Sequence, residues 1–204
     1  AYILYREQHK KLRDFANNAS VDMTDDYLKE KSWVAPKNDV ESFFNTGITR
    51  NNSISFAKST QDSGVRFSYA NQKTEGVVPN SSLTKNTFSI NANAKLSDKL
   101  KAEGMATYVQ TRGFNRPEVG YGDNGLGQKF YQWGQRQLDY DELKDYKLAN
   151  GAQRSWNRIA WDDATPNYSD NPYWIINENT SNDTRNRIYG NGKLTYNFTP
   201  ELYA

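Results

Sequence analysis

The sequence predicts an all-β chain that forms part of a large antiparallel transmembrane β-barrel. The first observation is long alternation with a period of two: Asn86–Leu96 alternates apolar side chains with Thr, Ser, Asn and Lys throughout. The second is that short turns and long loops join such segments in turn, as in outer-membrane barrels. The third is composition: 14% of residues are aromatic, mean hydropathy is −0.96, and no apolar run approaches the roughly 18–20 residues of a membrane helix.

Residues 1–45 are expected to form an extracellular loop or segment before the first clear strand. Within it, Tyr2–Asn17 has the charged character of a surface helix and Trp33–Pro36 is expected to be extended. Residues 46–204 are expected to form part of the barrel. Because the chain begins without Met and ends after Thr199-Pro200 at the apparent start of another strand, we expect an internal piece of a longer protein.

The first three predicted strands precede Leu100. Alternation is weak in the first, Ile48–Lys58, and clearer in the second, Val65–Lys73, which has Val65, Phe67 and Tyr69 on one side. The third, Asn86–Leu96, has the clearest pattern, with Phe88, Ile90, Ala92, Ala94 and Leu96 on one side.

Two further strands follow. In the fourth, Leu100–Thr111, small and apolar residues oppose Lys101 and Glu103. In the fifth, Arg185–Phe198, the side ending in Phe198 opposes one that carries Arg187 and Lys193.

The connections alternate in length, and this predicts orientation. Short turns occur at Ser59–Gly64, Ser97–Lys99 and Thr199–Glu201, whereas Thr74–Lys85 and Arg112–Thr184 are long. Since barrels of this class have short periplasmic turns and longer extracellular loops, the loop at 112–184 is expected outside the cell. Two short helices are expected in it, at Gln128–Leu138 and Asp139–Lys147.

Composition excludes several kinds of site. The chain has no cysteine, one histidine (His9) and a net charge of +2, so we expect no disulfide, no metal centre and no nucleic-acid partner. Asp123-Asn124-Gly125 and Asp162-Asp163 lack the spaced oxygen ligands of a calcium loop. Glycosidases need two carboxyl groups at a fixed separation, and these carboxylates lie on solvated loop, so we expect no enzyme.

An ordered series of short motifs resembles the SusC/RagA family of TonB-dependent outer-membrane transporters of Bacteroidetes. The resemblance covers most of the chain. The motifs are Phe43-Phe44-Asn45-Thr46-Gly47, Asn51-Asn52-Ser53, Arg66-Phe67-Ser68-Tyr69, Gly76–Ser81, Asn86-Thr87-Phe88, Ala94–Leu100, Gln132–Asp139, Asp170-Asn171-Pro172-Tyr173-Trp174 and Arg185–Gly190.

The resemblance implies a barrel of about 22 strands with a plug in its lumen. It also implies a SusD-like surface lipoprotein over the extracellular mouth, and energy from TonB through a region absent from this chain. The implied function is uptake of oligosaccharides or oligopeptides across the bacterial outer membrane, without a cofactor.

Aromatic residues crowd the long loop and form the candidate site. Flat rings stack on sugar faces, and neighbouring Asp and Asn bind hydroxyls. The cluster is therefore a candidate surface for binding the ligand or the SusD-like lipoprotein that covers the mouth as a lid. Arg136 is a candidate clamp for a carboxylate, or a partner of Asp139 or Asp141. The alternative is that the rings pack the core of the loop, above all Tyr173 and Trp174. The candidates are Tyr131, Trp133, Arg136, Trp156, Trp161, Tyr173 and Trp174, with Tyr168 among them in sequence.

Charged residues within the predicted strands are expected to face the lumen. A charge on the lipid face near the midplane costs about 2–4 kcal/mol, which favours the wet side. They are Arg66, Lys95, Lys101, Glu103, Arg187 and Lys193.

A second reading of the same alternation is a soluble extracellular β-sandwich that binds carbohydrate through an aromatic platform. A sandwich covers its apolar strand faces with another sheet, whereas a barrel leaves them to lipid.

Overall fold

The computed structural model describes residues 35–134, 136, 138–157, 159, 163, 165–199 and 201–204. The predictions for His9, Tyr2–Asn17, Trp161 and Asp162 lie outside these residues. The chain divides into two compact units. The sheet unit comprises Thr46–Arg116 and Ser181–Ala204, and the loop unit comprises Ala1–Asn45 and Pro117–Thr180.

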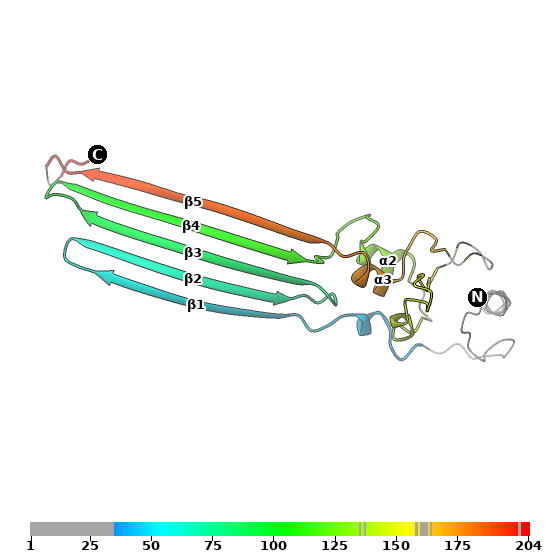
Figure 1. Ribbon diagram of the computed structural model, residues 1–204. Helices are drawn as coiled ribbons and strands as arrows, with labels where there is room; N and C mark the ends of the chain where they lie inside the picture. Colours follow the sequence, from blue (N-terminus) through cyan, green and yellow to red (C-terminus); the bar gives the residue numbers. More distant parts are fainter. Residues whose placement is uncertain are drawn as a thin grey trace. The chain divides into compact units, whose positions relative to one another are not determined.

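Five antiparallel strands form the sheet unit, and their order in the sheet is their order in the chain (Figure 1). The five predicted strands are therefore confirmed. Each is longer than an average strand of about 5–6 residues, at 12 to 15 residues. They are β1 (Ile48–Ser59), β2 (Ser63–Glu75), β3 (Ser82–Lys95), β4 (Leu100–Phe114) and β5 (Asn182–Tyr196).

The connection between β2 and β3 is shorter than the predicted Thr74–Lys85. The two strands stay paired as far as Glu75 opposite Ser82, so the turn is only Gly76–Ser81. It is closed by a hydrogen bond from the Gly76 N–H to the Ser81 carbonyl at 2.9 Å. The last paired residues of β2 and β3 were not predicted, because Thr, Lys and Asn at the strand ends nearest this turn break the apolar alternation.

The other connections follow the predicted pattern of lengths. The β1–β2 and β3–β4 turns are tight, with the Thr60 N–H bonded to the Ser63 carbonyl at 2.7 Å. The long connection begins after Phe114 and ends before Asn182, which face each other in the register of β4 and β5. After β5, Asn197 bridges Tyr203 in an antiparallel pairing.

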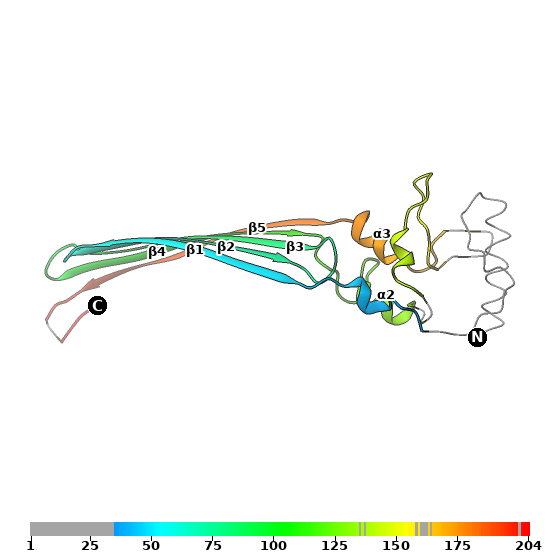
Figure 2. The ribbon, with the colours of Figure 1, turned by 90° about the horizontal axis from the view of Figure 1, so that it is seen from below.

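The register brings the apolar sides of all five strands onto one face. Directly opposed residues in an antiparallel pair lie on the same face. Tyr69 opposes Phe88, Phe88 opposes Tyr108, and Tyr108 opposes Ile188. We call this side the apolar face and the other the polar face. Figure 2 shows the sheet turned by 90°, as a single layer.

The described residues of the loop unit form four short helices. They are η1 (Val40–Phe43), α2 (Leu126–Gln132), η2 (Glu142–Lys144) and α3 (Pro172–Asn177). The helix predicted at Gln128–Leu138 begins earlier and ends at Gln132, just before Gly134. The one predicted at Asp139–Lys147 is a single turn, η2. No helix of the described residues is long and apolar enough to cross a membrane.

Aromatic rings form the core of the loop unit. Phe43 is buried, with ring centroids 5.0 Å from both Phe130 and Tyr173. Phe130 in turn lies 5.6 Å from Tyr140 and 6.4 Å from Trp156. Most of these pairs meet edge to face, the arrangement that aromatic quadrupoles favour. Five separate stretches of the chain thus share one small core.

Candidate functional site

Asn171 is the polar centre that holds the aromatic segment in place. It is 1% exposed, and its Oδ1 accepts a hydrogen bond from the Tyr173 N–H at 2.8 Å, which caps α3. Its Nδ2 donates to the carbonyls of Leu143 and Arg154 at 3.1 and 3.2 Å. One side chain therefore ties the start of α3 to two other loop segments. The signal was present in the sequence, since Asn followed by Pro is a strong helix start.

Two of the candidate aromatics are core residues. Tyr173 is buried against Phe43, and Trp156 packs on Phe130 while its Nε1 donates to the Ser169 carbonyl at 3.1 Å. Burial raises the pKa of the Tyr173 hydroxyl. For these two residues the packing alternative holds.

Trp133 and Tyr168 form a stacked pair at the surface. Their ring centroids are 5.1 Å apart with an interplanar angle of 9°, and Tyr168 is 72% exposed. The backbone of Tyr168 has a positive φ of 59°. The buried Lys129 holds it there by donating from Nζ to the Tyr168 carbonyl at 2.9 Å. Neither the stacking nor the contribution of Lys129 can be read from residue spacing, because the two rings come from distant segments.

Trp174 occupies an intermediate position. Its ring lies 6.2 Å from that of Tyr146, and the Lys147 Nζ lies 5.6 Å from its centroid. Lys147 also forms an ion pair with Glu178 at 3.0 Å. Trp174 is half-buried, and its ring already has a cationic partner in the Lys147 ammonium group. Tyr131, by contrast, is 98% exposed.

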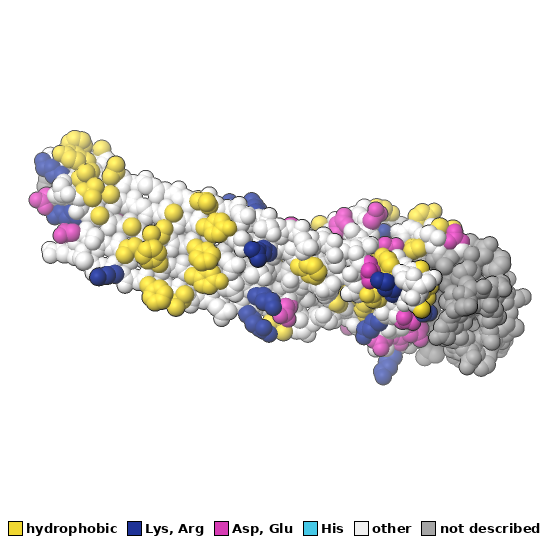
Figure 3. Space-filling model, viewed as in Figure 1, with side chains coloured by type: hydrophobic (Ala, Val, Ile, Leu, Met, Phe, Trp, Pro, Cys, Tyr) yellow, Lys and Arg dark blue, Asp and Glu magenta, His cyan; other side chains and the backbone are white. Residues whose placement is uncertain are grey.

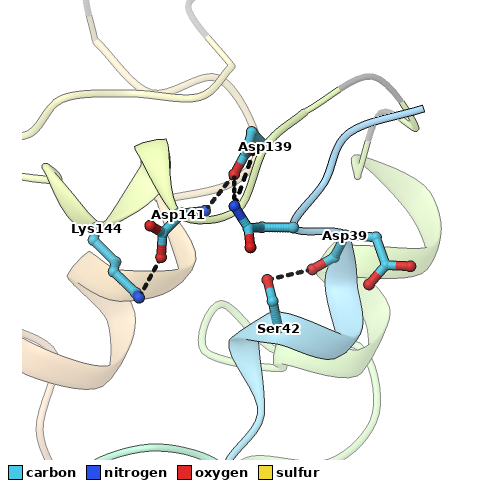
Figure 4. A network of polar contacts seen from close by, with 6 residues as sticks. Asp39, Ser42, Asp139, Asp141 and Lys144 are labelled. Atoms are coloured by element: carbon cyan, nitrogen blue, oxygen red, sulfur yellow. Dashed lines mark hydrogen bonds and ion pairs between the residues drawn. The ribbon is translucent and has the colours of Figure 1, made fainter. Parts of the chain in front are cut away.

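Arg136 is exposed, and its proposed carboxylate partners are engaged elsewhere. Asp139 accepts hydrogen bonds from Asn38 Nδ2 at 3.0 Å and from the Asp141 N–H at 2.9 Å (Figure 4). Asp141 forms an ion pair with Lys144, which raises the pKa of that ammonium group. Among the described residues, no ion pair joins Arg136 to either acid.

The described residues contain no group of three or more His, Cys, Asp or Glu side chains able to hold a metal ion. Asp163 accepts hydrogen bonds from the Thr165 side chain and from the Thr165 N–H, the latter at 2.9 Å, and these lower the pKa of its carboxyl group.

The six charged strand residues all lie on the polar face. Glu103 opposes Lys193, Lys95 opposes Lys101, and Arg187 opposes Val109. Arg66 opposes Asn91, and Asn91 opposes Met105, which lies on the same side of β4 as Lys101 and Glu103. Lys95 also forms an ion pair of 2.7 Å with Asp98 in the β3–β4 turn, and this lowers the pKa of Asp98.

The apolar face is exposed along most of the sheet. Figure 3 shows hydrophobic side chains gathered across the strands on the visible face. Phe56 is 67% exposed and Ile188 is 80% exposed, at opposite edges of the sheet. Four cations share this face: Lys58 lies at the end of β1 beside the β1–β2 turn, and Arg50, Lys73 and Arg112 lie toward the opposite end of the sheet. The other large exposed residues on the face are Ile48, Ile54, Phe67, Phe88, Ile90, Leu194 and Tyr196.

An aromatic row and an amide row cross the apolar face side by side. Tyr69 and Phe88 have ring centroids 4.7 Å apart, and Tyr108 follows at 6.2 Å from Phe88. The Tyr69 hydroxyl donates to Asn86 Oδ1 at 2.9 Å, and the Tyr108 hydroxyl donates to Asn186 Oδ1 at 2.8 Å. Both hydroxyls therefore point at the same row of amides. By register that row is Asn52, Asn71, Asn86, Gln110 and Asn186.

Comparison with known proteins assigns no family. No protein-family model matches the chain, and no curated protein matches it.

Proposed function

We propose that this chain is part of the wall and an outer loop of a TonB-dependent nutrient importer in the bacterial outer membrane, of the SusC/RagA type. The observation that carries the proposal is the apolar face of β1–β5, which no second sheet of the described residues covers. Exposed apolar surface of this extent is rare on soluble monomers and is typical of membrane or partner contact. A soluble sandwich needs a facing sheet.

The exposed apolar side chains of the apolar face form a band across the sheet, here called the apolar band, and its height suits an outer membrane. Between Tyr108 and Leu100 the apolar side of β4 spans eight residue steps, or about 26 Å along the strand at ~3.3 Å per residue. At a tilt of about 40° this is roughly 20 Å along the membrane normal, and the side chains extend it toward the ~25 Å of barrel proteins.

Aromatic residues flank the band at both ends, as in membrane barrels. Tyr69, Phe88 and Tyr108 end it on the long-loop side. Tyr196 and Phe198, with centroids 4.9 Å apart, lie at the opposite end. Rings with one polar atom are stable at the interface, where the hydroxyl reaches polar groups and the ring remains among acyl chains.

The polar face suits a wet lumen. It carries the six charged side chains named above, whose transfer to lipid would cost about 2–4 kcal/mol each near the midplane. In the proposed barrel these residues line the wall or contact the plug.

The sheet edges require further strands. One edge of β1 has no partner strand among the described residues, and the outer edge of β5 meets only the short pairing at Tyr203. In lipid every backbone polar group needs a partner, so a spanning sheet of this kind must close. We therefore place these five strands in a larger plugged barrel.

Cargo or lid contact is proposed at the surface of the loop unit. The stacked Trp133–Tyr168 pair, with exposed Tyr131 and Arg136, offers flat rings and a cation to an oligosaccharide, an oligopeptide or a SusD-like lipoprotein. Tyr173 and Trp156 support this surface from the core and are not proposed as contacts. TonB would act through a region outside this chain.

Insertion is tested by lipid-borne quenching at single cysteines placed in this chain, which has none of its own, in a complete protein from which any other cysteine has been removed. The complete protein carries a single fluorophore at Ile90→Cys or Leu194→Cys on the apolar face, or at Asn91→Cys or Lys193→Cys on the polar face. In vesicles containing brominated lipid, we expect quenching at positions 90 and 194 and none at their neighbours 91 and 193. Equal quenching at all four positions, or none, would overturn the barrel.

The cargo site is tested with a glycan array and an oligopeptide array applied to the complete protein. We expect Trp133→Ala and Tyr168→Ala each to weaken binding by roughly tenfold, the loss of one stacked ring. Tyr121→Ala, which removes another exposed ring of the loop unit, is the matched control. Equal binding by all the variants would remove the pair from the site.

A further inference from the structure

A row of cations crosses the apolar face beyond the amide row. Arg50 opposes Lys73, Lys73 opposes Thr84, and Thr84 opposes Arg112. All three cations therefore share the face that carries the exposed apolar band. Figure 3 shows dark blue side chains beside the yellow band on this face. These residues carry no functional signal in the sequence, because they lie at the strand ends nearest the long connections, where alternation is weak.

The row is largely free of counter-charge. Lys73 has an ion pair with Glu75 at 3.6 Å, with both side chains about half exposed. Arg50 and Arg112 are exposed and form no hydrogen bond or ion pair with other described residues. Two guanidinium groups thus remain available, each able to bind a phosphate through two parallel N–H donors.

The distance of the row from the apolar band matches a headgroup layer. Arg112 lies four residues beyond Tyr108 in β4, which is about 13 Å along the strand and roughly 10 Å along the normal at a ~40° tilt. The polar layer of a bilayer adds about 5–8 Å beyond the hydrocarbon core on each side. Long cationic side chains close the remaining gap by leaning toward the lipid.

We propose that Arg50 and Arg112, with Lys73 between them, bind the phosphates of anionic lipid headgroups in the outer leaflet around the barrel. The inference rests on the proposed function, because only a bilayer around the apolar band brings headgroups to this row. It adds a lipid ligand that is separate from the cargo. Adjacent strands lie about 4.8 Å apart, so the row spans three strand spacings, wide enough for more than one phosphate.

The test compares two matched double variants of the complete protein in detergent. Arg50→Gln/Arg112→Gln removes the free cations of the row. Lys85→Gln/Arg185→Gln removes two cations from the polar face, one residue away in β3 and β5. Each protein is mixed with phosphatidylglycerol and phosphatidylcholine, and retained lipids are counted by native mass spectrometry. We expect wild type and control to retain phosphatidylglycerol preferentially, and the row variant to lose roughly fivefold for each cation removed.

Three outcomes would overturn the lipid site. They are equal loss in both variants, no preference for phosphatidylglycerol in wild type, and equally strong retention of inorganic phosphate without lipid. Arg50→Lys/Arg112→Lys keeps the charge and is expected to retain most of the preference, while salt added to wild type is expected to reduce it. These two measurements decide the matter if the Gln variant does not fold.

Quenching separates this inference from the proposed function. If the fluorophore at Ile90→Cys is quenched by brominated lipid but the row shows no phosphatidylglycerol preference, only the lipid site is wrong. If the fluorophore at Ile90→Cys is not quenched, the barrel itself is wrong.

Discussion

At the scale of single residues, the loop unit depends on a few side chains that each join distant segments. Asn171 satisfies one N–H and two carbonyls at once, and Lys129 fixes the Tyr168 backbone from a buried position. Buried polar groups of this kind contribute most when every partner is present, because each unpaired group costs about 1–3 kcal/mol. The surface rings are held by such residues rather than by their own contacts.

Replacing Asn171 should destabilise the loop unit strongly. Asn171→Ala removes the cap of α3 and leaves two carbonyls without their donor, so we expect a loss of about 2–4 kcal/mol in the free energy of unfolding. Asn150→Ala removes an exposed turn hydrogen bond to the Ala152 N–H and should cost less than about 0.5 kcal/mol. Urea unfolding followed by tryptophan fluorescence measures both. Equal effects would contradict the assignment of Asn171 as the centre.

High pH should weaken the loop unit through Tyr140. Burial, and then the nearby charge of Asp39, raise the pKa of its hydroxyl above the ordinary value of 10.0. Above about pH 10 the unfolded chain therefore loses this proton while the folded chain keeps it, and the free energy of unfolding falls until the raised pKa is passed. Well below pH 10 this hydroxyl is protonated in both states, so its contribution to stability is fully present and does not vary with pH.

The check is urea unfolding at a series of pH values. Tyr140→Phe should reduce the alkaline loss of stability, whereas Tyr131→Phe, at an exposed ring, should leave it unchanged. An unaltered loss in Tyr140→Phe would assign the effect to another group.

At the scale of elements, the strands are defined by alternation and the helices by their caps. Long period-2 patterns predicted β1–β5 because each strand has one apolar side and one polar side. The β2–β3 turn was misjudged because the outer strand ends are polar on both sides. The helix α3 was missed although Asn171-Pro172 is a start signal, since six residues are too few for a visible helical period.

Substitutions at two glycines of β5 are expected to have different effects on the free energy of unfolding. A Cβ at Gly190 would collide with the Met105 carbonyl oxygen, whereas nothing lies within 4 Å of a Cβ at Gly192. We expect Gly190→Ala to lower the free energy of unfolding by about 1–3 kcal/mol and Gly192→Ala to leave it unchanged or slightly raised. Denaturant unfolding of the complete protein in detergent compares them. Similar effects from both substitutions would mean that the β4–β5 register differs there.

At the scale of the whole molecule, sequence and structure agree on one antiparallel sheet with a long insertion between β4 and β5. The sheet was predictable because its information is local to each strand. The aromatic core of the loop unit was not, because Phe43, Phe130, Tyr140 and Tyr173 come from four segments that no periodicity links. The outward Trp133–Tyr168 pair was hidden among the core rings for the same reason.

The chain alone should not behave as a soluble monomer. Its apolar face and its two open sheet edges favour association in water. We expect oligomers or aggregates in buffer by analytical ultracentrifugation, and dispersion in detergent. Phe56→Asn/Phe67→Asn should reduce association more than Arg66→Asn/Lys193→Asn on the other face. A cooperative, detergent-free monomer would rule out the barrel.

The long connection between Asn115 and Ser181 also has a consequence for the order of folding. Strands β1 to β4 follow one another through short turns, so they can pair one hairpin at a time. The β4–β5 pair must first close a long segment, and each doubling of a loop raises the entropic barrier by about 0.6 kcal/mol. Contacts at such sequence separation form slowly. We therefore expect β5 to join the sheet last. Its pairing with β4 would begin beside the hydrogen bond of 2.6 Å from the Asn115 N–H to the Ser181 carbonyl.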